Sequence, residues 1–325
     1  MKSKVLRLLS DSFYVSGESI SHTLGISRAA VWKYINSLKS EGYIIESSTN
    51  KGYKILNRPD LLTYEEVSAY LKTKFIGRNL SHYNSLASTN TKAKEIGSCD
   101  FIDGTVLVSE EQLNGRGRLG RNWSSPKSKG IWMSILLKPD IPPTEAYKVT
   151  IIAAAAVYRA LAESNVCSLV KWPNDIVINN KKVCGILTEM NAELSRIHYL
   201  VIGIGINVNT SEDEFPEDIR EKASSLFVES GRTFDRKVIM SSILNNYEAL
   251  YKDFLTSGSI AESIAICREN SAVLGREVVL IEGNNTKVVE VIDISENGHL
   301  IVKDSNETRE ILSGEISVRG KNGYI

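Results

Sequence analysis

The first sixty residues carry hydrophobic positions at helical spacing, followed by an alternation typical of strands. Apolar side chains recur on one helical face over residues 5–9, 20–24 and 31–38, and a Gly-Ile pair interrupts the pattern after Leu24. Residues 43–56 then alternate around a polar turn, as the two strands of a β-hairpin do. Three short helices, a tight turn and a hairpin predict a winged helix-turn-helix.

The polar face of the third predicted helix supplies candidate contacts to DNA. Ser27 is suited to cap this helix, and the hairpin would touch the phosphate backbone while the helix enters a major groove. The side chains expected to contact DNA are Ser27, Arg28, Trp32, Lys33, Asn36 and Lys51. The alternative is a small helical domain for protein interaction, whose charged side chains only solvate its surface.

The distribution of charge favours the DNA-binding interpretation. The chain as a whole is balanced, with 39 basic and 39 acidic residues. Residues 1–58, however, contain nine lysines and arginines against four acidic residues. A basic first segment on an acidic body is typical of a polyanion-binding module attached to another domain.

The middle of the chain, from residue 80 to residue 270, alternates strand-like and helix-like segments without a regular repeat. Strands are predicted at 105–108, 131–137, 176–178, 183–190 and 199–203, and helices at 144–163 and 235–254. A linker is expected at 57–60, followed by a helix that opens with the capping box Thr63-x-x-Glu66. The order predicts an α+β fold with mixed strand pairing rather than a series of βαβ units.

Composition excludes several classes of protein. No apolar run is long enough to span a membrane, and the N-terminus lacks the features of a signal peptide. The four cysteines form no C-x-x-C pair, which argues against a zinc site and a disulfide framework. We therefore expect a cytoplasmic protein with reduced thiols and no membrane partner.

Four local motifs could carry chemistry. Residues 112–123 interleave three glycines with three arginines, which suits a phosphate-bearing ligand but lacks the ending of a P-loop. Lys-Trp-Pro-Asn-Asp at 171–175 ends a strand with polar side chains, and Gly185 after Lys182 would let a ligand approach a strand. Residues 203–209 hold two glycines without the third that dinucleotide spacing requires. Taken singly, each motif is also compatible with an ordinary turn or with close strand packing.

Together and in this order, these motifs closely resemble those of the bifunctional biotin ligase and biotin-operon repressor (BirA) family, as does Ser88-Thr89-Asn90 upstream of them. The resemblance covers essentially the whole chain and includes the winged helix, which ligase-only relatives lack. It implies a winged helix DNA-binding domain at 1–58, a catalytic biotin- and ATP-binding domain at 61–270 and a C-terminal domain at 273–325. The central domain would be a class II synthetase-like mixed sheet with helices. The last domain would be a small SH3-like β-barrel, with strands at 277–280, 288–292, 299–302 and 309–312 and hairpin turns at 283–285 and 296–298.

The resemblance also implies roles for individual residues. Ser88, Thr89 and Gln112 would hydrogen-bond the ureido end of biotin, and Lys182 would hold the biotin carboxylate and the phosphate. The residues implied to bind biotin are Ser88, Thr89, Asn90, Gln112, Gly115, Arg116, Gly117, Arg118, Lys182 and Gly185. Those implied to bind the nucleotide are Trp123, which would pack on adenine, with Arg121, Asn174 and Asn207. Lys182 and Arg118 would be the catalytic residues, and the sequence leaves the ligands of Mg²⁺ unassigned.

The chemistry that this family performs has two halves. The biotin carboxylate attacks the α-phosphate of ATP, with Mg²⁺ as cofactor, and the resulting biotinyl-5'-AMP then acylates a lysine of the biotin carboxyl carrier protein. The same adenylate would act as corepressor, promoting a homodimer that binds operator DNA. Two alternatives remain open from the residues: a lipoate–protein ligase of the same fold, and a biotin-sensing repressor without catalysis. The arginine loop and the winged helix argue against the first, and the intact Lys182 and Arg118 argue against the second.

Overall fold

The computed structural model describes residues 1–283, 285–304, 307–314, 316–320 and 324–325. Its contacts divide the chain into two compact units, Met1–Ala69 and Tyr70–Ile325. Within the described ranges, no helix combines the length and the hydropathy needed to cross a membrane.

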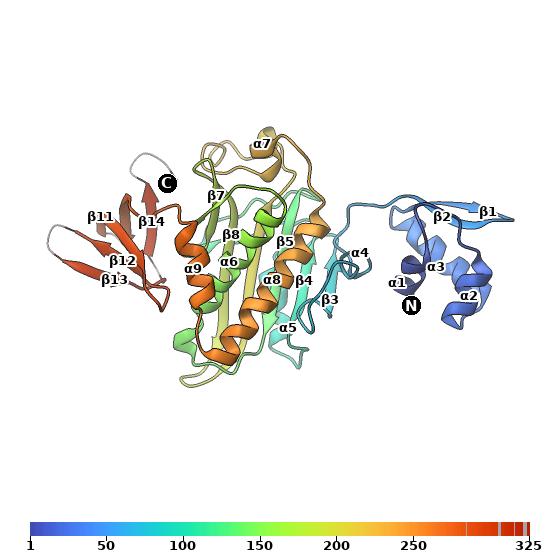
Figure 1. The fold of residues 1–325 in the computed structure, drawn as a ribbon, viewed down its shortest axis with the longest axis horizontal. Coiled ribbons are helices and arrows are strands. Elements are labelled where there is room, and N and C mark those ends of the chain that lie inside the picture. The colour runs from blue at the N-terminus through green and yellow to red at the C-terminus, as the bar shows by residue number, and fades with distance from the viewer. Residues whose placement is uncertain (284, 305–306, 315, 321–323) are drawn as a thin grey trace. The chain divides into compact units, whose positions relative to one another are not determined.

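The first unit is a winged helix-turn-helix (Figure 1). Its elements are α1 (Lys2–Leu8), α2 (Gly17–Leu24), α3 (Arg28–Ser40), β1 (Ile44–Ser48), β2 (Gly52–Asn57) and α4 (Tyr64–Val67). Ser16 and Ser27 cap α2 and α3 by accepting hydrogen bonds from backbone N–H groups in the first turns. Gly25 ends α2 in the left-handed conformation, which turns the chain into α3. The apolar faces predicted for the three helices pack into one core with the inner residues of the hairpin.

The hairpin is drawn against the helices by a close backbone approach. Gly52 has φ +101°, and a Cβ atom there would lie 2.2 Å from the carbonyl oxygen of Val15. Val15 and Tyr53 exchange backbone hydrogen bonds of 2.9 Å, which adds a short third strand to the wing. Only glycine fits at position 52 because any side chain would strike this backbone.

The helix predicted after the linker is present, but the expected capping box does not form. Thr63 precedes α4 without a side-chain hydrogen bond to it. Glu66 is buried and accepts hydrogen bonds from the Tyr43 hydroxyl and from the Arg58 guanidinium, at 2.5 and 3.2 Å. Its carboxylate is engaged by the winged helix, which explains why the first compact unit extends past the predicted linker to Ala69.

The second unit is built on a seven-stranded sheet in the order β3-β4-β5-β9-β8-β7-β6. The strands are β3 (Leu80–Tyr83), β4 (Thr105–Ser109), β5 (Gly130–Leu137), β6 (Leu169–Lys171), β7 (Asp175–Ile178), β8 (Lys181–Ala192) and β9 (Ile197–Asn207). Neighbouring strands are antiparallel except for the parallel pair β3 and β4. β4 and β5 are buried along their whole length, which matches their continuous apolar sequence.

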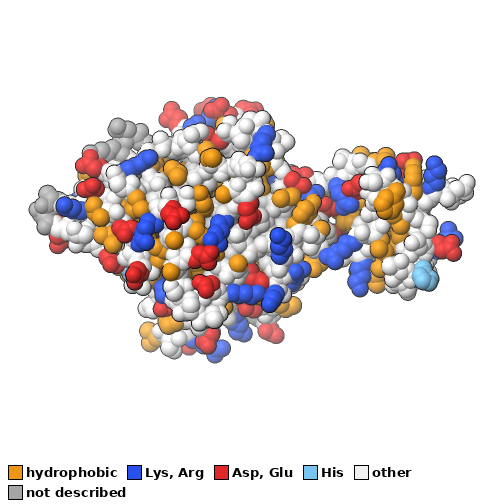
Figure 2. All heavy atoms as spheres, in the orientation of Figure 1, with side chains coloured by type: hydrophobic (Ala, Val, Ile, Leu, Met, Phe, Trp, Pro, Cys, Tyr) orange, Lys and Arg blue, Asp and Glu red, His pale blue; other side chains and the backbone are white. Residues whose placement is uncertain are grey.

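Helices and short turns complete this unit. They are α5 (Thr89–Gly97), η1 (Arg118–Gly120), η2 (Pro143–Glu145), α6 (Lys148–Glu163), η3 (Glu212–Glu214), α7 (Leu226–Ser230), α8 (Arg236–Ser257) and α9 (Ala261–Glu269). The long helices α6 and α8 lie side by side across one face of the sheet (Figure 1). The alanines 153–156 of α6 are fully buried, because small side chains let this helix lie close to its neighbours. Acidic and basic side chains are interspersed over the face that carries these helices (Figure 2).

The C-terminal part of the described chain forms a five-stranded antiparallel sheet in the order β13-β12-β11-β10-β14. Its strands are β10 (Glu277–Glu282), β11 (Asn285–Ile294), β12 (Leu300–Lys303), β13 (Thr308–Ile311) and β14 (Ile316–Gly320). The first four were predicted and β14 was missed, because its pattern is short and broken by polar residues. The predicted turn at 283–285 includes Asn284, which lies outside the described residues. The α+β class and the order of winged helix, mixed sheet and antiparallel C-terminal module are confirmed.

Candidate active site

A cavity of about 380 Å³ opens beside the middle strands of the large sheet. Its walls come from the Gly/Arg loop, the start of α5, the strands β7, β8 and β9, the segment 215–223 and the C-terminal module. Sequence motifs that lie far apart in the chain therefore meet at one site. Every residue expected to bind biotin or nucleotide lines this cavity except Gly115. Gly115 is buried, and a Cβ atom there would lie 2.4 Å from the carbonyl oxygen of Trp123.

Trp123 forms a flat wall over two glycines of the sheet. A Cβ atom on Gly205 would lie 2.6 Å from the indole Nε1 of Trp123, and one on Gly185 would lie 3.0 Å from the ring. Gly185 and Gly205 are paired across β8 and β9, so together they make a smooth floor for the indole. The indole N–H is buried and has no hydrogen-bond partner among the described residues. An aromatic face with one free donor suits a heteroaromatic ligand.

A polar network lies at the other end of the cavity, where α5 begins. The backbone N–H and the hydroxyl of Thr89 both donate to Gln112 Oε1, at 2.9 and 3.1 Å. Gln112 Nε2 donates to Ser125 at 2.9 Å, and Ser134 donates to the Thr89 hydroxyl oxygen at 2.8 Å. Ser88 caps α5. The network fixes the orientation of the Gln112 amide and the Thr89 hydroxyl before any ligand is bound.

Asn90 is held differently from its two neighbours in the motif. Its amide group donates to the Leu187 carbonyl and the Glu189 carboxylate, at 3.2 and 2.8 Å, and its oxygen accepts from Ser134 at 2.7 Å. Gly203 makes room for it, since a Cβ atom there would lie 2.2 Å from Asn90 Oδ1. Both amide hydrogens of Asn90 are thus used by the protein, so this side chain shapes the wall and ties α5 to the sheet.

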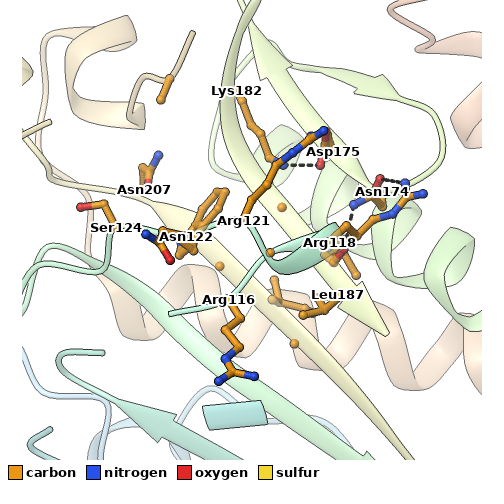
Figure 3. A pocket seen from close by; sticks show the side chains of 18 of the residues that line it. Arg116, Arg118, Arg121, Asn122, Ser124, Asn174, Asp175, Lys182, Leu187 and Asn207 are labelled. Carbon is orange, nitrogen blue, oxygen red and sulfur yellow. Dashed lines mark hydrogen bonds and ion pairs between the residues drawn. The ribbon is translucent and has the colours of Figure 1, made fainter. Parts of the chain in front are cut away.

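Lys182 lies beside an acidic partner at the end of the cavity that Trp123 forms. Its Nζ is 2.5 Å from Asp175 Oδ1 and 5.2 Å from the centre of the Trp123 ring. Burial opposes ionisation of Asp175, but Lys182 and Lys171 lower its pKa, so the carboxylate is charged. Asp175 holds the ammonium group in place at the rim of β8, where an incoming anion would find it (Figure 3).

The three arginines of the loop are not equivalent. Arg118 donates to Asn174 Oδ1 at 2.9 Å and to the carbonyls of Gly314 and Ile316 in the C-terminal module. Arg121 is exposed and extends toward Lys182, whereas Arg116 points away from both other arginines (Figure 3). Backbone bonds from Gly117 to Arg121 and from Trp123 to Gly115 close the loop into a narrow hairpin. Arg118 therefore fastens the loop to the end of the chain.

The two asparagines expected on the nucleotide side support the surrounding backbone. Asn174 Nδ2 donates to the carbonyl of Ile186 at 2.8 Å, so the turn after β6 is bound to β8. Asn207 Nδ2 donates to the carbonyl of Ser224 at 2.9 Å and positions the segment that follows β9. Both line the cavity, and both also hold its walls together.

Comparisons with known proteins agree with this geometry. The biotin/lipoate A/B protein ligase family model matches residues 83–207, an HTH domain model matches residues 2–54, and the biotin protein ligase C terminal domain model matches residues 273–319. The bifunctional ligase/repressor BirA of Bacillus spizizenii is 38% identical over 309 residues, which make up 94% of each chain. This chain belongs to the BirA family of bifunctional ligases and repressors. The predicted ligase and repressor functions are those of this family.

More distant members cover the chain equally well. The bifunctional ligase/repressor BirA of Escherichia coli is 28% identical over 320 residues, 97% of this chain and 96% of that one. Among solved structures, the biotin protein ligase from Aquifex aeolicus in complex with biotin and ATP has a TM-score of 0.66 and 31% identity. It covers 75% of this chain and the whole of that one.

Sequence reasoning missed several residues that line the cavity. The segment 215–223 lines the cavity with Phe215, Ile219 and Ala223, and its backbone pairs with that of Lys182. No sequence motif marks this segment. It lines the cavity only because the chain folds back so that its backbone pairs with the start of β8. A buried aromatic in an otherwise acidic loop was the one available signal.

Trp172 of the Lys-Trp-Pro-Asn-Asp motif lines the cavity, and its indole is hydrogen-bonded to the C-terminal module. Its ring is buried, and Nε1 donates to the carbonyl of Gly298 in the C-terminal module at 2.9 Å. Trp172 therefore anchors that module to the ligase domain, while its neighbours Lys171 and Asp175 face the cavity together with Arg319 and Tyr324.

In the winged helix, the residues expected to touch DNA lie largely at the surface. Ser27, Arg28, Trp32 and Lys33 are exposed on α3, with 61% of Trp32 accessible, and Asn36 is half-buried one turn further on. Lys51 is exposed at the tip of the wing, with Nζ 5.6 Å from the centre of the Tyr14 ring. A large exposed aromatic among cations on one helix is unusual for a surface that meets only water.

Proposed function

We propose that this BirA-family chain activates biotin as biotinyl-5'-AMP in the cavity, transfers it to a lysine of a biotin carboxyl carrier protein, and represses biotin genes when adenylate persists. The observation that carries the catalytic part is the cavity itself. It joins a preorganised amide and hydroxyl network at one end to Trp123, Lys182 and the arginine loop at the other. The head group of biotin needs hydrogen-bond donors and acceptors, as the first end offers. An adenylate needs an aromatic surface and positive charge, as the second end offers.

The network around Thr89 and Gln112 is the proposed site for the ureido end of biotin. A ureido group needs both donors and acceptors, and the Ser88 and Thr89 hydroxyls and the Gln112 amide offer both. Because the network is already hydrogen-bonded, little side-chain entropy would be lost on binding. Asn90 and Gly185 would shape the site, and Gly117 and Arg116 would close over it.

The nucleotide would occupy the space between Trp123 and Lys182. Adenine would stack on the indole, whose free N–H would donate to it. Lys182 would leave Asp175 in part to meet the biotin carboxylate and the α-phosphate, and Arg121 would face the outer phosphates. Electrostatic stabilisation of the charge that builds on phosphate would supply most of the rate.

Mg²⁺ would reach this site on the phosphates of ATP. No group of three or more histidine, cysteine or acidic side chains that could hold a metal lies among the described residues. Mg²⁺ in phosphate-transfer sites is bound mainly by the substrate, so this observation is compatible with Mg·ATP as the form that binds. The ion would neutralise phosphate charge, and the residues named above would orient the reacting groups.

The adenylate must be kept from water until an acceptor arrives. The loop that carries Arg116, Gly117 and Arg118 closes one side of the cavity, and Arg118 ties it to the C-terminal module. The acceptor lysine would then attack the acyl carbon, and AMP would leave with its electron pair. Positioning is expected to contribute more than acid–base catalysis.

Repression would depend on a pair of chains on a symmetric operator. A single winged helix makes few base contacts, and specific binding usually needs two half-sites. We propose that adenylate promotes a homodimer by ordering the arginine loop, so that adenylate and operator raise each other's affinity. The protein would work in the cytoplasm, where its four free cysteines stay reduced.

One experiment tests the ligase function and separates it from its alternatives. The protein is incubated with Mg·ATP, a carrier-domain acceptor and either biotin or lipoate, and the mass of the acceptor is measured. Addition of one biotinyl group with biotin alone is expected. Lipoylation would indicate a lipoate ligase, and an unmodified acceptor with intact biotin binding would indicate a sensor without catalysis.

DNA binding is tested by single substitutions on α3 with a matched control on α1. Arg28→Ala and Trp32→Ala are expected to reduce operator affinity by about 5–150-fold each, because each contact to a base is worth about 1–3 kcal/mol. Lys4→Ala removes an exposed cation from the first helix and should change affinity only slightly. If all three variants bind the operator alike, α3 is not the recognition helix.

A further inference from the structure

Tyr324 enters the ligase cavity from the far end of the chain. It lines the cavity together with Ser317, Val318 and Arg319 of β14. Its hydroxyl donates to Asp175 Oδ2, and its backbone carbonyl accepts a hydrogen bond of 2.8 Å from Lys171 Nζ. Neither the family motifs nor the roles proposed above account for these contacts.

The contacts of Tyr324 all involve charged groups of the site. Lys171 Nζ lies 3.4 Å from the centre of the Tyr324 ring, and the Arg319 guanidinium lies 4.9 Å from it. Lys171 is almost fully buried, with 3% of its surface exposed, so the ring and the carbonyl take the place of water around its ammonium group. Burial and the nearby Asp175 raise the pKa of Tyr324, so its hydroxyl remains a donor to the carboxylate.

Asp175 connects Tyr324 to the catalytic lysine. One carboxylate oxygen accepts from Tyr324, and the other is 2.5 Å from Lys182 Nζ. A carboxylate held at both oxygens cannot rotate freely, so the hydroxyl of Tyr324 determines where Asp175 directs Lys182. Position matters here, because misplacement of a reacting group by about 1 Å can reduce a rate about a hundredfold.

We propose that Tyr324 is a positioning residue for adenylate formation, which fixes the Asp175 carboxylate and covers Lys171 so that Lys182 points at the reacting phosphate. The inference rests on the proposed ligase function. Tyr324 forms part of the cavity wall and does not block the cavity, since a volume of about 380 Å³ remains open with the side chain in place. A side chain that blocked the cavity would compete with ATP and slow the reaction, whereas a positioning residue accelerates it.

Two variants separate the hydroxyl from the ring. Tyr324→Phe removes only the donor to Asp175, and Tyr324→Ala also uncovers Lys171. Tyr158→Phe is the matched control, because it removes a comparable tyrosine hydrogen bond, 2.6 Å to Asn270, outside the cavity. Each variant of the full chain is assayed by biotin-dependent exchange of pyrophosphate into ATP, with thermal unfolding as a check on the fold.

The expected result is a fall in kcat of about tenfold or more for both Tyr324 variants, as for a lost hydrogen bond to a charged group. The KM for biotin should stay within about twofold of wild type, because the ureido network is untouched. A purely structural role would instead lower the unfolding temperature and affect both constants. Exchange at the rate of Tyr158→Phe would overturn the proposal.

Faster exchange or a lower KM for ATP in Tyr324→Ala would also overturn it, because the side chain would then be blocking the phosphates. Failure of the proposed function is distinguishable, since the wild-type chain itself would show no biotin-dependent exchange, and the assignment of Tyr324 would fall with it. An active wild type with an unaffected Tyr324→Phe variant would reject the positioning role alone.

Discussion

A single methyl group on the floor of the cavity tests where the nucleotide lies. In Gly205→Ala the new Cβ atom would lie 2.6 Å from Trp123 Nε1 and 2.8 Å from Cε2. Comfortable contacts between such atoms are about 3.5–4.0 Å, so the indole would have to move by about 1 Å. Trp123 belongs to a loop and is half-buried, so its displacement should not unfold the sheet.

The cost of this displacement should appear in ATP binding. Inserting a methyl group into a well-packed site costs about 1–3 kcal/mol. If adenine needs the indole in its present position, that energy is lost from nucleotide binding, and the KM for ATP should rise about 5–150-fold. The proposed biotin end of the cavity lies around Thr89 and Gln112, so the dissociation constant for biotin should remain nearly unchanged.

The assay combines pyrophosphate exchange over a range of ATP concentrations with titration calorimetry for biotin. Gly203→Ala is the matched control on the same strand, because its Cβ atom would lie 2.2 Å from Asn90 Oδ1 at the other end of the site. It should weaken biotin binding and spare the KM for ATP. If Gly205→Ala leaves the KM for ATP within twofold of wild type, Trp123 does not form the adenine wall.

Three further predictions concern the charged groups of the site. Lys182→Ala should slow pyrophosphate exchange by about 2–4 kcal/mol of transition-state stabilisation with an unchanged unfolding temperature, and a rate within threefold of wild type would contradict its role. Arg118→Gly should release free biotinyl-5'-AMP and label non-cognate lysines, because the loop loses its bonds to Asn174 and the C-terminal module. Burial lowers the pKa of Lys171 to about 7 despite the nearby Asp175, so this lysine is charged below pH 7 and loses its proton above it. Phosphate favours the charged form, so the KM for ATP should increase above pH 7 by up to about tenfold per pH unit, and a flat profile between pH 6 and 9 would reject this.

Local patterns were sufficient to predict most of the fold. The winged helix follows from apolar spacing, two serine caps and Gly25, all of which act within a few residues. The strands of the large sheet follow from their apolar runs except β3, which was missed because its four residues, Leu80–Tyr83, form no apolar run and are only half-buried. β14 was missed because only five residues define it, and its place depends on pairing with β10 rather than on its own pattern.

The residues of the candidate site could be predicted where another group lies so close to the backbone that only glycine fits. Gly185 and Gly205 stand where a side chain would strike Trp123, and glycine in a predicted strand indicated such a close approach. The partner of each polar side chain was not predictable. Arg118 bonds to carbonyls nearly two hundred residues away, and Lys171 bonds to Tyr324 at the far end of the chain. Such pairs depend on how the C-terminal module docks, which periodicity does not encode.

The docking of that module has a consequence for the order in which the two activities arise during synthesis. Domains fold as they leave the ribosome, beginning with the N-terminal one. The winged helix is complete once Ala69 has emerged, whereas the cavity still lacks its anchor at Gly298 and the lining residues Ser317, Val318, Arg319 and Tyr324. A nascent chain can therefore hold a finished DNA-binding unit while it is still unable to make adenylate. We therefore expect the reactive intermediate to be made only by molecules whose translation has passed β14 and reached Tyr324.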